Sequence, residues 1–150
     1  MKHILAQMLI IICFPVIAYS SLAETAILGD WIITENVTPR SYITGPPEEG
    51  KLLLNAHLSF KKDVMSLASK IFKNISYDVK TYTADDVFKG WHIRLKELGI
   101  SERSVVIIEV IPKEENAYIE ISQFIRKSDD VFIAITENGL FEMRRMQRVK

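Results

Sequence analysis

The side chains that most often carry out chemistry are few in this 150-residue chain, and they lie apart in the sequence. His57 and His92 have no ligand-type neighbours at the spacing of a metal site, so we expect each to be a surface or half-buried residue. Adjacent acids occur at segments that resemble turns or a helix start. Because neighbouring side chains point apart, these acids are solvated caps and not a general acid–base pair. They are Glu48-Glu49, Asp85-Asp86, Glu114-Glu115 and Asp129-Asp130.

No motif supplies an activated nucleophile or a phosphate-binding loop. The sequence contains neither a Gly-x-Ser-x-Gly elbow nor a Gly-rich phosphate loop. The single cysteine, Cys13, lies within the apolar N-terminal run, so the rest of the chain has no thiolate ligand and no disulfide. The sequence therefore predicts no catalytic residue, no metal site and no cofactor, and an enzyme is the least supported class of function.

The N-terminal segment, residues 1–23, has the features of a secretory signal peptide. Lys2 provides the positive start, residues 4–18 are almost wholly apolar, and Ser21-Leu22-Ala23 offers the small residues that a signal peptidase reads. An uncleaved membrane anchor is the alternative, but the apolar run is shorter than the roughly 20 residues that a spanning helix needs. We therefore predict cleavage after Ala23, one domain of residues 24–150, and a periplasmic or extracellular location for a protein that is not integral to the membrane.

Composition limits the partners of this domain. Loss of Lys2 with the signal peptide leaves 19 − 1 = 18 basic and 19 acidic residues, a net charge of −1. This balance argues against binding to nucleic acid or to an anionic membrane surface. With 48% apolar and 25% charged residues, the chain can bury a core of its own.

Short apolar or alternating runs recur along the domain and predict β-strands. Residues 104–111 are apolar on both faces, which is typical of a strand covered on both sides. In residues 117–125, Ile119 and Ile121 share one face with Ile125. Glu137-Asn138-Gly139 favours a hairpin, because Asn-Gly tolerates a positive φ. The predicted strands are 29–36, 51–60, 63–68, 75–82, 104–111, 117–125, 130–136 and 139–146.

One segment, residues 83–99, is predicted to be helical. Thr83 and Asp86 have the spacing of a capping box, and Gly99 occupies a typical C-terminal position. Gly90 weakens the pattern, and two short strands around a Phe-Lys-Gly-Trp turn are the alternative. Many short strands, hairpin signals and one helix together predict a mainly β protein, an antiparallel barrel or sandwich.

Residues 37–50 contain three prolines and two glycines, which predicts a long irregular connection between strands. Long connections in small domains often carry function. Within this loop Arg40 and Tyr42 are the best candidates for binding residues, because both types are enriched at interaction hot spots. The alternative is a proline-rich crossover that only covers one end of the barrel.

Two short motifs at the ends of the domain indicate a more specific architecture. Gly29 and Trp31 form a Gly-x-Trp at the start of the first predicted strand, and Arg145 lies near the end of the last one. In this the chain resembles the lipocalin-like β-barrels, in particular small exported bacterial members. The resemblance implies a single up-and-down barrel in which the arginine stacks on the tryptophan as a structural plug at one end. The alternative is that Trp31 is an ordinary core residue and Arg145 a solvated one.

These observations leave two hypotheses for function. The first is an exported, non-enzymatic barrel that holds a small apolar or amphipathic ligand inside. The second is an exported protein-binding module, such as an inhibitor or immunity protein directed against a cell-wall-degrading enzyme. An interior cavity of about 300 Å³ or more favours the first hypothesis, and a filled interior with an exposed aromatic patch favours the second.

Overall fold

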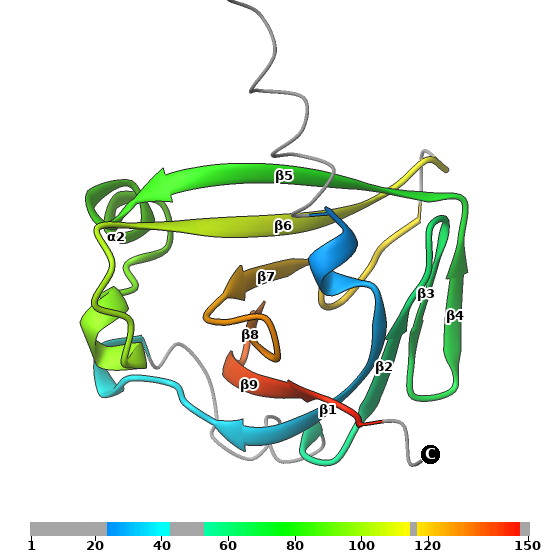
Figure 1. Ribbon diagram of the computed structural model, residues 1–150, viewed down its shortest axis with the longest axis horizontal. Helices are drawn as coiled ribbons and strands as arrows, with labels where there is room; N and C mark the ends of the chain where they lie inside the picture. The colour runs from blue at the N-terminus through cyan, green and yellow to red at the C-terminus, as the bar shows by residue number, and fades with distance from the viewer. Residues whose placement is uncertain (1–23, 43–52, 115–116, 148–150) are drawn as a thin grey trace, which may run out of the picture.

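Nine antiparallel strands form one sheet that curls into a nearly closed barrel in the computed structural model, which describes residues 24–42, 53–114 and 117–147 (Figure 1). The strands are β1 (Gly29–Asn36), β2 (His57–Phe60), β3 (Val64–Leu67), β4 (Lys70–Lys73), β5 (Ile75–Thr83), β6 (Ser104–Pro112), β7 (Gln123–Arg126), β8 (Val131–Thr136) and β9 (Gly139–Arg145). The helical elements are α2 (Ala84–Trp91), the short 3-10 helices η1 (Arg40–Tyr42) and η3 (Leu95–Leu98), and a turn at residues 24–27. The predicted up-and-down barrel with one short helix is confirmed.

Most strands pair with the strands before and after them in the chain. The exceptions are β1 and β9, which pair with each other and so bring the two ends of the domain together, and β4 and β5, which follow one another in the chain but do not pair. The order β4-β3-β2-β1-β9-β8-β7-β6-β5 leaves β4 and β5 as the two edges of the sheet. At the seam between them the Ile75 amide donates to the Asp63 carbonyl, with 3.2 Å between N and O.

Large side chains fill the interior of the barrel. Trp31 meets Phe132 edge to face with ring centroids 5.1 Å apart, and Phe60 meets Phe124 in the same way at 5.1 Å. These four rings, with Phe141, are at most 1% exposed. Because a ligand-sized hole would leave accessible surface on the residues around it, their burial means that side chains pack this interior.

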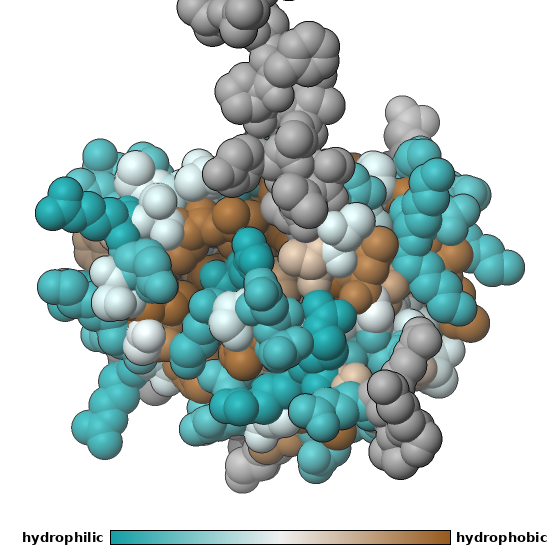
Figure 2. All heavy atoms as spheres, in the orientation of Figure 1, coloured by the Kyte–Doolittle hydropathy of each residue, from teal (hydrophilic) through white to brown (hydrophobic). Residues whose placement is uncertain are grey.

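A second apolar layer covers the outer face of β6 to β9. Val105 and Ile107 of β6 pack outward against α2 and η3, whereas Ile108 and Val110 point into the barrel. The predicted two-sided burial of residues 104–111 is therefore confirmed. Figure 1 shows α2 and the turn that contains η3 together at one side of the barrel, where this layer lies. Polar side chains dominate the face in Figure 2, and apolar atoms are visible between them below β5 and β6.

The predicted helix over residues 83–99 is wrong in its length. The capping box at Thr83 and Asp86 is present, but α2 ends at Trp91 because His92 takes a left-handed conformation with φ 57°. The chain then forms the separate η3, which ends at Gly99 with φ 71°. The left-handed residue His92 thus divides the expected helix into two short ones, and Gly99 ends the second at the predicted C-terminal position.

Two of the predicted strands also differ from the structure, and one observed strand was not predicted. In the strand predicted over residues 51–60, residues 51–52 lie outside the described part of the chain, residues 53–55 form a turn, and only β2 is a strand. In the strand predicted over 117–125 only residues 123–125 pair, as part of β7, although Ile119 and Ile121 are buried in the interior cluster. Ile119 and Ile121 are therefore buried although they lie before β7 and belong to no strand. The sequence pattern missed β4, because four residues that begin and end with lysine carry too short a signal.

Candidate functional site

The predicted Gly-x-Trp and arginine motifs meet at one end of the barrel. Trp31 and Arg145 are directly opposite each other in the β1–β9 ladder, and the Arg145 guanidinium carbon lies 4.3 Å from the centroid of the Trp31 ring. Trp31 is fully buried, and its indole Nε1 donates to the Ile27 carbonyl at 2.7 Å. The stack therefore has an aromatic ring facing the interior and a cation on the outside.

The guanidinium of Arg145 also joins two other segments at this end. It donates to the carbonyl oxygens of Leu28 at 2.8 Å and Ala26 at 2.5 Å, and in the β7–β8 turn to the Asp129 carbonyl and an Asp130 carboxylate oxygen, both at 3.1 Å. All of these acceptors are protein groups, so the arrangement fixes the N-terminal turn and the β7–β8 turn against the barrel.

The backbone conformation and surroundings of Gly29 explain why the motif requires a glycine. Its φ is +125°, and a Cβ atom placed on it would lie 2.9 Å from Nη1 of Arg145. A side chain at this position would be strained by the backbone and would also displace the guanidinium from the tryptophan. In the Gly-x-Trp motif, the glycine thus leaves room for the Arg145 guanidinium and the tryptophan provides the ring on which it stacks.

A buried carboxylate lies next to this end of the barrel, on the outer face of β9. The Glu142 side chain is only 5% exposed, and it accepts from Lys127 Nζ at 3.1 Å and from Arg144 Nε and Nη2 at 3.0 and 2.7 Å. Burial raises the pKa of this carboxyl, but the hydrogen bonds and charges of the two cations outweigh burial, so its pKa lies below the ordinary value. The sequence pattern missed this cluster because residues 126–130 and 144–150 each resemble a solvated charge run.

The predicted binding residues at the start of the loop have different environments. Arg40 is exposed, whereas Tyr42 is half-buried against the outer apolar layer, and its hydroxyl donates to the Thr136 carbonyl at 3.5 Å. Burial raises the pKa of the Tyr42 phenol. Tyr42 therefore anchors the chain to the β8–β9 hairpin and leaves Arg40 as the accessible residue. Residues 43–50 of the predicted loop lie outside the described part of the chain.

Thr38 secures the same segment from the other side. Its hydroxyl accepts from the Leu140 amide at 2.8 Å, and the Val37 amide donates to the Leu140 carbonyl at 2.9 Å. Gly139 has a φ of +143°, and a Cβ atom there would lie within 2.3 Å of the Thr38 hydroxyl oxygen. The glycine of the predicted Asn-Gly hairpin is thus also required for docking of the loop base.

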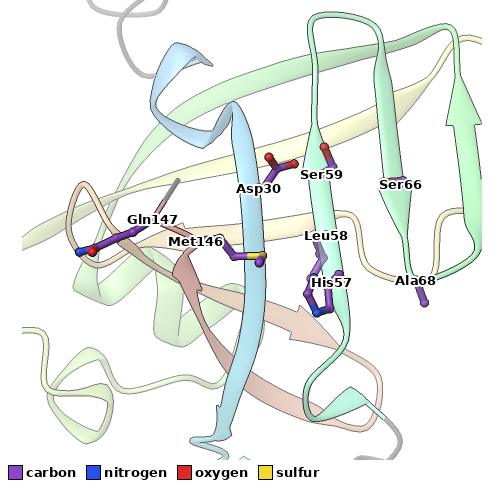
Figure 3. A pocket seen from close by; sticks show the side chains of 8 residues that line it. All are labelled: Asp30, His57, Leu58, Ser59, Ser66, Ala68, Met146 and Gln147. Atoms are coloured by element: carbon purple, nitrogen blue, oxygen red, sulfur yellow. The ribbon is translucent and has the colours of Figure 1, made fainter. Parts of the chain in front are cut away.

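A hollow of about 330 Å³ opens on the outer face of β1, β2 and β3 (Figure 3). It exists because the outward residues of β2 and β3 are small: Ser59 and Ser66 leave a depression that larger side chains would fill. Asp30 of β1 and His57 of β2 contribute polar groups, and Met146, which follows β9 and is 39% exposed, contributes an apolar one. The remaining lining residues are Leu58, Ala68 and Gln147. This hollow combines apolar, carboxylate and imidazole groups.

The other residues considered for chemistry are dispersed. His57 lies in the hollow, whereas His92 ends α2 with its ring 6.0 Å from that of Phe88. Within residues 24–42, 53–114 and 117–147, no three histidine, cysteine or carboxylate side chains gather where they could hold a metal ion. Among the helices of the same ranges, none is long and apolar enough to cross a membrane.

Comparisons of the chain with protein-family models, with curated proteins and with solved structures returned no match. The resemblance to lipocalin-like proteins therefore rests on the residues of the Trp31–Arg145 stack and on the architecture of the barrel.

Proposed function

We propose that this chain is an exported, non-enzymatic binding module that acts through its outer surface and has a protein partner in the cell envelope. The observation that carries this proposal is the packed interior. The rings of Trp31, Phe60, Phe124, Phe132 and Phe141 are all buried inside the barrel, where an interior ligand would have to lie. This counts against an apolar ligand inside the barrel and supports the protein-binding hypothesis. Of the two features expected for that hypothesis it supplies the filled interior, whereas no Phe, Tyr or Trp among the described residues lines the hollow over β1 to β3.

Two features of the outer surface support recognition of a protein. The hollow over β1 to β3 can receive one side chain of a partner, with Met146 as an apolar contact and Asp30 and His57 as polar ones. Arg40 is exposed on a turn that Tyr42 and Thr38 hold in place. A rigid base that displays an exposed arginine lowers the entropy lost on binding. An inhibitor or immunity protein directed against a cell-wall-degrading enzyme is the function that we infer for such a module.

Site-specific photo-crosslinking tests the protein partner. A photoreactive residue at Ser66, in the floor of the hollow, should yield one defined adduct in the cell envelope, and the same residue at Lys96 on η3 is the matched control. Met146→Asp should abolish the adduct at Ser66, because it places a charge in the apolar part of the hollow. Equal adducts at Ser66 and Lys96, or an adduct that survives Met146→Asp, would contradict the role of the hollow.

Two further measurements test the rest of the proposal. Denaturing extraction and mass spectrometry of the purified protein should find no stoichiometric lipid or metabolite, and a bound apolar molecule would restore the interior-ligand hypothesis. Intact-mass analysis of the protein from the expressing cell should give a chain that begins at Glu24 if the signal peptide is removed after Ala23. Inhibition of a lytic enzyme from the same envelope by this protein would identify the class of partner.

A further inference from the structure

β5 has one hydrogen-bonding edge without a partner strand in the described part of the chain. It is nine residues long and pairs with β6 along its whole length, but it lies at the end of the strand order. β4 precedes it in the sequence and forms the opposite edge of the sheet, so the barrel has a seam beside β5 (Figure 1). Open strand edges are templates for pairing with another chain.

The hydrogen bonds at the ends of β5 show which backbone groups face this seam. The Asn74 carbonyl accepts from the backbone amide of Lys113, and the Ala84 amide donates to the backbone carbonyl of Arg103. The backbone groups of even-numbered residues therefore bond toward β6. Alternate residues of a strand bond in opposite directions, so the odd-numbered residues face the free edge.

The ends of this free edge are already occupied. The Ile75 amide donates to the Asp63 carbonyl at 3.2 Å, and the Thr83 amide donates to the carboxylate of Asp86 at 3.2 Å. Within the described residues, the backbone groups left for a partner belong to Tyr77, Val79 and Thr81, at the centre of the strand. The Tyr77 hydroxyl also donates to the Lys61 carbonyl at 2.6 Å, so the side chain at this end of the set is held in place.

We propose that a second copy of this chain pairs with the free edge of β5, antiparallel and with Val79 opposite the partner's Val79. In this register Tyr77 faces the partner's Thr81, and each of the opposing pairs exchanges two backbone hydrogen bonds. The two barrels then share one continuous sheet across a twofold axis, as an isologous dimer requires.

The side chains beside these groups are complementary to themselves in this register. Asp78 and Lys80 both point outward, are 35% and 57% exposed, and form an ion pair with each other at 2.5 Å. In the dimer Asp78 lies opposite the partner's Lys80, and Lys80 lies opposite the partner's Asp78. On β6, Glu109 is directly across from Asp78, so a cation from the partner would meet two carboxylates there.

The same charges favour β5 of a second copy as the partner rather than a strand of an unrelated protein. A lysine in the middle of an edge strand normally prevents pairing, because an incoming strand leaves it beside an apolar or like-charged residue. A copy of β5 is one of the few sequences that brings an aspartate to this position from both sides. The charges on this edge therefore favour pairing of β5 with β5 of a second copy.

Charge reversal provides a direct test, with sedimentation velocity on the protein purified from its expressing cells. We expect a dimer that dissociates on dilution between about 1 mM and about 10 µM, the range of weak association. Asp78→Lys and Lys80→Asp should each weaken dimerisation by at least about tenfold, because each replaces two attractive cross-strand pairs with repulsive ones. Mixing the two variants should restore a one-to-one dimer, because the lysines of one then face the aspartates of the other.

Matched variants separate this interface from any other. Lys96→Asp reverses a charge on η3 and should leave dimerisation unchanged. Val79→Pro should produce a folded monomer, because the amide it removes faces the seam and not β6. Hydrogen exchange should show concentration-dependent protection at Tyr77, Val79 and Thr81. A wild-type monomer at about 1 mM, a dimer that Val79→Pro leaves intact, or no dimer in the mixture would overturn the proposal.

Discussion

Removal of Arg145 should destabilise the barrel through two losses that the structure allows us to separate. Arg145→Ala removes a cation 4.3 Å from the Trp31 ring, an interaction of about 1 kcal/mol at a partly exposed position. It also leaves the carbonyl oxygens of Ala26 and Leu28 without their donor, at about 1 kcal/mol each. We therefore expect the free energy of unfolding to fall by about 2–4 kcal/mol, since part of the side chain remains exposed to water.

A double-mutant cycle with Trp31 measures the stacking part alone. Trp31→Ala should cost about 3–5 kcal/mol, because the ring is fully buried. The double variant should be more stable than the sum of the single losses predicts by about 1 kcal/mol, the energy of the shared contact. Arg145→Lys is the matched control: it keeps the charge, but a single ammonium cannot replace donors that reach four separate acceptors, so most of the loss should remain.

Equilibrium denaturation in urea is the suitable measurement, with the slope of each transition compared so that changes in the denatured state are recognised. Purely additive losses would show that the guanidinium and the ring are not energetically coupled. An Arg145→Lys variant as stable as the wild type would show that the hydrogen bonds to Ala26 and Leu28 contribute nothing specific.

Three other substitutions test the interior, the buried carboxylate and the loop base. Ala134→Leu should lower the free energy of unfolding by about 1–3 kcal/mol because the packed interior has no room for the added atoms, and an unchanged or increased stability would indicate a hollow barrel. The lowered pKa of Glu142 means that its stabilising effect is complete above its ordinary pKa of 4.5 and is lost as the pH falls through the lower folded value, so Glu142→Gln should flatten this part of the stability–pH curve. Tyr42→Ala should lower the melting temperature and Arg40→Ala should not, because only Tyr42 packs on the outer layer, and equal effects in calorimetry would contradict that difference.

The sequence predicted the barrel mainly through features that act locally. Alternation in residues 29–36 and the two-sided burial of residues 104–111 depend on neighbouring positions alone, and both strands formed with nearly the predicted bounds. The spacing of Gly29 and Trp31 could also be recognised, because one glycine and one ring serve the same arginine. By contrast, the helix breaks at His92, which takes a left-handed conformation although it is neither a glycine nor an asparagine, so the sequence has no local signal for the break.

The functional surface was harder to predict, because its residues meet only after folding. The ion pair between Lys127 and Glu142 joins the β7–β8 turn to β9, and neither residue has an unusual neighbour in the sequence. The hollow over β1 to β3 depends on small residues such as Ser59 and Ser66, whose types are common on any exposed strand. The filled interior likewise depends on how large residues from distant strands interdigitate, which composition does not fix.

The pairing of β1 with β9 has a consequence for how the chain reaches its native state. Trp31 and Arg145 are partners across a ladder that joins the first strand to the last, so the barrel cannot close until nearly the whole domain is available. Closure of so large a loop is entropically costly, and contacts of this range slow folding. While β9 is still being synthesised, β1 lacks one of its two neighbours and the indole lacks its cation. The same ladder that completes the barrel therefore delays its closure until β9 has been synthesised, which keeps the emerging chain accessible to whatever carries or protects unfolded polypeptides in the cell.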